Sequence, residues 1–492
     1  HKDLPSVLKA GHHVKLTLKL SDDLLLDVAK VEIKKETITS DIPMDWLPKP
    51  KVEAEGFENN ILSFAETETK TAILNLNTAS ALQDLKLKFT FGDPQFSSLN
   101  DKDYLLSVPA DKAEMENVLG IVLPEIGVDK ASLDLTSIVA KLRTDAGTTV
   151  ENKIEVDVRA NNRWSSEEIK GQENPSRVYT LRCNKPEMAV SVQPGNIWTK
   201  EFTIDELTVT TGDPEVIKSK LKYQYKEKSG GDDTWKDIQD MKVLFNEHPQ
   251  NRSYQVRAVY RDVVMTDAID VELENPVQLP NSGMEEWHEE DQSDHKNLWF
   301  PFSQDLSLQW ITNNLETTNY RGESFCSASA VKRSENKYNG NYAALIRTIG
   351  HGVANTNVGS FLGMNGSITG THTIGILSYS GDFQVRPTKV KFYYRYIPEG
   401  DDVGVIELKI ENEDQDVILY EATNVVSKTE YQLYEIPINY MVENVVATKL
   451  TLTLKSGSKH TNVVKAKVRG NGADEHYGSE LYIDDISLVY DK

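Results

Sequence analysis

The sequence predicts an all-β fold divided among several domains, each built as a β-sandwich. At 492 residues, the chain exceeds the size at which a single hydrophobic core stops growing. Most of its periodic segments alternate apolar and polar residues, which is typical of half-buried antiparallel strands. These segments are short and are separated by turn residues, as in β-sandwiches.

Residues 1–186 are predicted to form a β-rich domain with one or two short helices. Residues 85–91 alternate, with Leu85, Leu87, Phe89 and Phe91 on one face, and residues 14–20 and 154–158 follow the same pattern. Helical spacing appears over residues 135–142, behind the capping candidate Asp134. A weaker helix is predicted over residues 111–120.

Residues 187–275 are predicted to form a spacer domain that starts after the Pro186 and Pro194 punctuation. A strand over residues 254–258 places Tyr254, Val256 and Ala258 on one face. It resembles the tyrosine-corner strand of fibronectin type III domains, in which a Tyr hydroxyl ties a corner to the backbone. The alternative is an ordinary alternating strand. The segment holds no cluster of catalytic residue types.

Residues 276–492 are predicted to form a C-terminal β-sandwich. Val390, Phe392, Tyr394 and Tyr396 alternate with polar or amphipathic residues, and "VIELKI" and "LTLTL" repeat the same period. Near the end of the chain, Asp484 and Asp485 interrupt an apolar strand. Adjacent carboxylates in a strand are costly if they are buried without a partner.

Composition excludes several classes of protein. The chain has 54 Lys and Arg against 76 Asp and Glu, a formal charge of -22, which repels nucleic acid. Its two cysteines, Cys183 and Cys326, form no zinc-binding spacing. No apolar run has the length of a membrane helix. Because the chain begins at His1 rather than Met, we expect any targeting segment to precede it.

Four ordered motifs after residue 276 carry a family resemblance. They are "NSGMEEW" at 281–287, "GSFLG" at 359–363, "GDFQVRPTKVKFYYRYI" at 381–397 and "LYIDDISLVY" at 481–490. Together they resemble the carbohydrate metabolism domain found at the C-terminus of surface lipoproteins from anaerobic gut bacteria. "PKVEAEGFENNILSFAE" and "LDLTSIVAKL" resemble the Ig-like modules that precede it. The chain departs from the family in lacking a lipobox cysteine and in its polar "SYSGDF" before Arg386-Pro387.

The resemblance implies a jelly roll of the galactose-binding type that binds a polysaccharide or oligosaccharide. It also implies a cell-surface, outer-membrane or periplasmic location, with a lipid anchor upstream of residue 1. In such domains calcium often joins the Glu of an Asn-x-Gly-x-Glu turn to an Asp of the last strand. Here that ion would lie between Glu285 and Asp484 or Asp485. The alternative is that one Asp faces solvent while the other accepts hydrogen bonds.

Sugar recognition needs flat aromatic faces, flanked by groups that bind hydroxyls. Trp287 follows the opening turn and is expected in the core. Trp299 and Trp310 lie near expected loops, and for each of them a core role and a sugar-binding role stay open. The candidate carbohydrate-binding residues are Trp299, Trp310, Tyr320, Arg321, Tyr393 and Arg395.

Two other functions stay open: a glycoside hydrolase with an unrecognised acid pair, and a structural or adhesive surface protein that binds no sugar. A glycosidase needs two carboxylates across a cleft. Acidic clusters such as "WHEED" are usually solvated faces in so acidic a chain. No His-Glu-x-x-His, Gly-x-Ser-x-Gly or P-loop motif appears, so we predict no catalytic residue.

Overall fold

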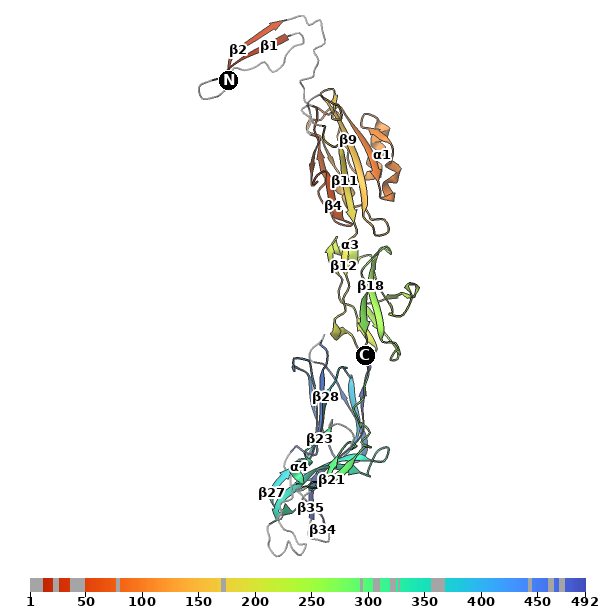
Figure 1. The fold of residues 1–492 in the computed structure, drawn as a ribbon, viewed down its shortest axis with the longest axis vertical. Helices are drawn as coiled ribbons and strands as arrows, with labels where there is room; N and C mark the ends of the chain where they lie inside the picture. Colours follow the sequence, from red (N-terminus) through yellow and green to blue (C-terminus); the bar gives the residue numbers. More distant parts are fainter. Residues whose placement is uncertain are drawn as a thin grey trace. The chain divides into compact units, whose positions relative to one another are not determined.

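The computed structural model divides the chain into two compact units, residues 1–185 and residues 186–492. Strands are the main regular secondary structure of both units (Figure 1), and they assemble into several sheets. The predicted all-β, multi-sheet class is therefore confirmed. The residues that the structure describes are 12–20, 26–35, 49–76, 80–169, 174–292, 295–303, 310–318, 324–325, 328–354, 368–440, 445–458, 464–468 and 474–492.

The first unit contains a six-stranded sheet, a three-stranded sheet and an N-terminal hairpin. In β6, Leu85, Leu87, Phe89 and Phe91 are all buried, as their alternation predicts. The hairpin pairs β1 (His12–Leu20) with β2 (Leu26–Lys35). The large sheet has the order β4 (Ile61–Ala65), β11 (Val178–Asn184), β9 (Val150–Ala160), β6 (Asp84–Phe91), β7 (Asp103–Leu105), with β10 (Arg163–Trp164) on β9; the small one has the order β3 (Glu53–Glu55), β5 (Ile73–Asn75), β8 (Ser132–Asp134).

Both predicted helices of the first unit exist, but their bounds differ from the prediction. They are α1 (Pro109–Leu119) and α2 (Thr136–Val139), and a 3-10 helix, η1 (Pro94–Leu99), precedes them. The predicted helix over 135–142 therefore shrinks to four residues. Leu135, Ile138, Val139 and Leu142 are nevertheless all buried, so the helical spacing marks core positions rather than the length of the helix. Asp134 accepts a hydrogen bond from the backbone N–H of Thr136, at 2.9 Å.

Residues 186–275 form a five-stranded sheet and two strand pairs. The Tyr254 hydroxyl donates to the Asn251 carbonyl at 3.0 Å, so it ties the start of β18 to the preceding backbone. The larger sheet has the order β16 (Lys236–Ile238), β15 (Leu221–Glu227), β18 (Ser253–Tyr260), β19 (Val264–Met265), with β20 (Ile269–Glu272) on β18; the pairs are β12 (Glu187–Ala189) with β14 (Thr208–Thr211) and β13 (Glu201–Thr203) with β17 (Lys242–Leu244); η2 (Pro194–Asn196), α3 (Pro214–Lys218) and η3 (Asp232–Thr234) connect them.

The C-terminal sandwich consists of a five-stranded and an eight-stranded antiparallel sheet. The first has the order β23 (Trp310–Thr312), β28 (Ile376–Asp382), β33 (Lys449–Lys455), β30 (Gly404–Glu411), β31 (Val417–Val425); the second has the order β24 (Ser324–Phe325), β26 (Ala343–Ala354), β35 (Asp474–Val489), β29 (Lys389–Ile397), β32 (Lys428–Pro437), with β25 (Val331–Ser334) and β27 (Ile368–Thr373) on β26 and β34 (Val464–Val468) on β35. A hairpin, β21 (His288–Gln292) with β22 (His295–Phe300), and the short helix α4 (Asn314–Thr317) accompany them.

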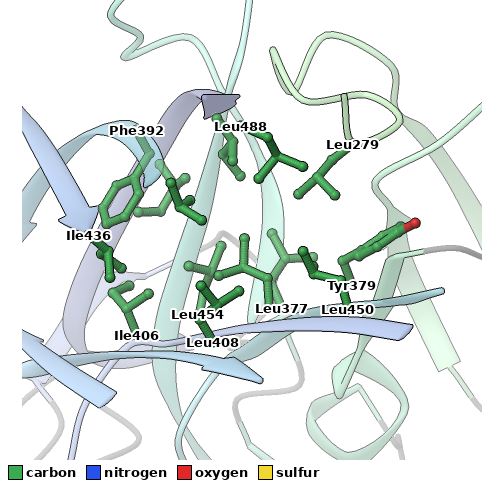
Figure 2. Packing of buried hydrophobic residues seen from close by; sticks show 14 of the residues in the cluster. Leu279, Leu377, Tyr379, Phe392, Ile406, Leu408, Ile436, Leu450, Leu454 and Leu488 are labelled. Atoms are coloured by element: carbon green, nitrogen blue, oxygen red, sulfur yellow. The ribbon is translucent and has the colours of Figure 1, made fainter. Parts of the chain in front are cut away.

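The core of the sandwich lies between the two sheets. Figure 2 shows side chains of both sheets packed together, among them Phe392 of β29, Leu488 of β35, Leu408 of β30 and Leu454 of β33. Because successive strand residues point to opposite faces, the residues between these core positions lie on the outer face. On β29 the outward residues are Lys389, Lys391, Tyr393, Arg395 and Ile397.

Arg386 ties residues 186–275 to the sandwich. Its side chain is 3% exposed, and its Nε lies 2.8 Å from Oε1 of Glu274. Nη1 donates to the Gly195 carbonyl at 2.7 Å, and Nη2 donates to the Ile197 carbonyl. The guanidinium carbon lies 3.8 Å from the ring centre of Trp198. The boundary proposed near residue 276 stays a prediction, because these contacts cross it within one unit.

Candidate functional site

Asp484 and Asp485 occupy a bulge in the last strand. The register of β29 against β35 shifts here, and Asp485 has a φ of 46°. Before the bulge, Leu481 and Ile483 face the core. The extra residue shifts the inward–outward alternation by one position, so that Ile486 and Leu488 face the core after it. Asp484 lies on the opposite face, beside Tyr393.

Asp484 accepts hydrogen bonds from the hairpin loop that connects β25 to β26. The backbone N–H groups of Tyr338 and Asn339 donate to its Oδ2 at 2.7 and 3.1 Å, and that of Asp485 donates to Oδ1 at 2.8 Å. The side chain is fully buried. Burial raises the pKa of Asp484, and the three backbone donors act in the opposite direction.

Glu285 and Asp485 hold the same loop at its other positions. The Glu285 carboxylate accepts from the Asn341 N–H at 2.8 Å and from the Tyr342 N–H at 3.3 Å. Asp485 accepts from the side-chain amide of Asn339 at 3.1 Å. Gly340 has a φ of 62°, and a Cβ there would lie 1.8 Å from Oε1 of Glu285. Only glycine allows this close approach.

These contacts offer an explanation of the carboxylates that requires no metal. No group of three His, Cys, Asp or Glu side chains within the described residues is placed to hold a metal ion. Glu285, Asp484 and Asp485 instead direct oxygens at N–H donors of the loop. Calcium binds through six to eight oxygens, of which these three carboxylates would supply only a part. Calcium stays a prediction of the sequence.

The pinned loop places an aromatic ring over the outer face of the larger sheet. Tyr338 stacks on Tyr393 of β29, with ring centres 3.5 Å apart and planes at 10°. Tyr338 is 47% exposed, so part of its ring faces solvent. Tyr431 of β32 lies 6.2 Å from Tyr338, and its hydroxyl donates to the Asn336 carbonyl at 2.7 Å. The phenol of Tyr393 raises the pKa of Tyr338.

Arg395 lies beside this aromatic pair, two residues after Tyr393 on the same face of β29. It is directly opposite Tyr482 of β35, and its guanidinium carbon lies 5.1 Å from the Tyr482 ring centre. Tyr393 and Arg395, both predicted from the sequence as sugar-binding residues, therefore come together with Tyr338, Tyr431 and Tyr482. We call these five residues the aromatic platform.

The predicted tryptophans lie elsewhere. Trp310 is 2% exposed, packs against Tyr379 and donates its indole N–H to the Pro280 carbonyl at 2.7 Å, so its ring offers no face to a sugar. Trp299 of β22 is half-buried, and the guanidinium of Arg333 lies 4.8 Å from its ring centre. Trp287 packs against the core, as expected. Tyr320 and Arg321 lie outside the described residues.

Sequence reasoning missed Tyr338. Its signal is an aromatic residue inside the Asn- and Gly-rich turn "SENKYNGNY" at 334–342. Such a turn is exposed, and an aromatic residue at its tip has no local apolar partner. The register that brings this tip over Tyr393 depends on pairings between distant strands, and no local pattern encodes them.

No protein-family model matches the chain, and no curated protein does. Among solved structures, TmCBM61 in complex with β-1,4-galactotriose is 12% identical, with a TM-score of 0.20, over 37% of this chain and 90% of that chain. A family 11 carbohydrate-binding module from Clostridium thermocellum, in complex with a β-1,3-1,4-mixed-linked tetrasaccharide, is 10% identical, with a TM-score of 0.20, over 38% and 92%.

The enzymatically active domain of bacteriophage CBA120 tailspike protein 4 is 5% identical, with a TM-score of 0.22, over 37% of this chain. The match spans only 19% of that chain. Likeness at these scores and identities assigns no ligand, and the family resemblance drawn from the sequence stays a prediction. In the described part of the chain, no helix has both the length and the apolar character that a membrane span requires.

Proposed function

We propose that the C-terminal sandwich binds glycan on the aromatic platform, and that the upstream residues act as spacers that present it. The observation that carries this proposal is the stacked pair of Tyr338 and Tyr393, of which Tyr338 keeps nearly half its surface exposed. An exposed aromatic face covers the C–H surface of a sugar ring, while neighbouring amide and guanidinium groups bind its hydroxyls.

The fixed position of Tyr338 favours a binding role over a chance surface contact. Its loop is held by Asp484, Glu285 and Tyr431 from three different parts of the chain. A ring that is already fixed loses little conformational entropy when a ligand stacks on it. This arrangement resembles the rigid aromatic anchors that dominate binding energy at recognition surfaces.

The spacer role draws support from the Arg386 contacts. Buried polar contacts between residues 186–275 and the sandwich hold the two parts as one unit. A spacer that is fixed to its binding domain presents the platform in a defined direction. A cell-surface location, as the family resemblance implies, would make such presentation useful, and it belongs to the same proposal.

A glycan array with the full chain tests the proposal. Tyr338→Ala should weaken binding of the glycans retained by the wild type about tenfold, because it removes the exposed ring. Tyr420→Ala is the matched control, since Tyr420 of β31 is a similarly exposed tyrosine, 52% exposed, on the other sheet. Equal binding by both variants and the wild type, or no glycan bound at all, would overturn the proposal.

A further inference from the structure

The cations on the outer face of β29 differ in their partners. The Nζ of Lys389 lies 3.4 Å from a carboxylate oxygen of Asp491, and the Nζ of Lys391 lies 2.7 Å from a carboxylate oxygen of Glu435. For Arg395, the residues that the structure describes supply no ion pair and no hydrogen bond, and its Nε is buried without a partner. Its contact is with the face of Tyr482.

A guanidinium without an acidic partner is costly where water is partly excluded. The carboxylates around Arg395 are already engaged. Asp484 accepts three backbone N–H groups, and Glu480 accepts the Tyr482 hydroxyl at 3.1 Å. The charge of Arg395 lowers the pKa of both Tyr431 and Tyr482, against the larger effect of their burial, so it acts on two of the four rings of the platform.

The strand fixes the distance between this charge and the stacked tyrosines. Arg395 and Tyr393 are two residues apart on one face, which corresponds to about 7 Å along a strand. A glycan that lies on the rings therefore brings substituents of the same or the next sugar over Arg395. Arginine binds carboxylate and sulfate oxygens in a planar, two-pronged geometry, which neutral hydroxyls match less well.

We propose that the platform takes an acidic glycan, and that Arg395 binds the carboxylate or sulfate group of one of its sugars. This inference rests on the proposed function and narrows its substrate class. Polygalacturonate and alginate, each compared with its carboxyl-reduced form, probe the carboxylate. Chondroitin sulfate, compared with its desulfated form, probes the sulfate.

We expect the full chain to bind at least one charged polymer about tenfold to a hundredfold more tightly than its neutralised form, as for a charge-assisted hydrogen bond. Arg395→Gln should abolish that preference and leave binding of the neutralised form unchanged. Lys391→Gln is the matched control, because it removes a positive charge from the same strand face where Glu435 already pairs with it. It should keep the preference.

Two results would overturn the inference while the proposed function stands. One is that every neutralised polymer binds as tightly as its charged parent. The other is that Arg395→Gln weakens both members of a pair equally, with circular dichroism showing an intact fold, so that Arg395 acts on sugars regardless of charge. If the chain binds none of these polymers, the inference fails, and the Tyr338→Ala array then decides the proposed function separately.

Discussion

Arg386 and Glu274 form a buried ion pair, 2.8 Å between Nε and Oε1, that joins two parts of the second unit. Burial raises the pKa of Glu274, and the charge of Arg386 acts against that rise. Arg386→Gln should lower the free energy of unfolding by about 3–5 kcal/mol, because it leaves a buried carboxylate without its cation. Urea denaturation measures this loss. Adding Glu274→Gln should restore part of it, and a double variant no more stable than the single one would contradict the ion-pair explanation.

The same contacts predict how fragments behave. A chain that starts at residue 276 lacks Glu274 and the Gly195 and Ile197 carbonyls, so Arg386 loses three partners. Residues 276–492 should therefore melt about 5 °C or more below residues 186–492. Calorimetry of the two fragments checks this difference. Equal melting temperatures for the sandwich transition would show that residue 276 is an independent domain boundary.

Gly340 is a second point at which a small change should have a large effect. Gly340→Ala places a methyl group against Glu285 and keeps the residue at positive φ. Both the free energy of unfolding and the affinity for glycan should therefore fall. Gly400→Ala is the matched control: its φ is 67°, and a Cβ there meets nothing within 4 Å.

The control carries only the backbone cost, about 1–2 kcal/mol. The additional loss of unfolding free energy in Gly340→Ala then reports the contact with Glu285. Identical losses in the two variants would mean that the loop moves aside without cost.

Asp484 should leave a signature in the pH dependence of stability. Its pKa is raised in the folded state from the ordinary value of 3.8, so the folded protein binds this proton more tightly than the unfolded chain does. Ionisation therefore costs stability, and the cost grows as pH rises from the unfolded pKa through the folded one.

Urea denaturation of the wild type and Asp484→Asn between about pH 3 and pH 7 isolates this effect. The stability of the wild type relative to the variant should fall as pH rises. A difference that rises with pH would contradict the direction of the pKa shift.

Calcium can be tested by melting the protein in EDTA and in excess calcium. Because the three carboxylates direct oxygens at N–H donors, we expect the same melting temperature in both solutions. An ion that bound the folded state alone would raise the melting temperature with its concentration. A rise with calcium that disappears in Asp485→Asn would establish the metal site that the sequence suggests.

Period-two alternation predicted the strands of the fold because it reports burial directly. Phe392 and Tyr394 of β29 are buried as their positions indicate. Helical spacing was less informative about length. It marked Leu135 and Leu142 as core residues, but the helix between them spans only Thr136–Val139, since loop residues also supply core contacts.

The candidate site was predictable only in part. Residue types drew attention to Tyr393 and Arg395, and to Asp484 in its apolar strand. Asp484 binds the backbone of Tyr338 and Asn339, which lie 146 and 145 residues earlier in the chain. Backbone donors leave no mark in a sequence, so neither this contact nor the position of Tyr338 follows from local pattern.

The place of β35 in its sheet has a consequence for biosynthesis. This strand lies between β26 and β29, and it is the last of the domain to be translated. At roughly 5–20 residues per second, about four to sixteen seconds separate the emergence of Phe392 from that of β35. Throughout that interval, the apolar faces around Ile346 and Phe392 have no central strand to join them. The nascent sandwich therefore exposes these apolar faces, a state prone to aggregation, until its final strand leaves the ribosome.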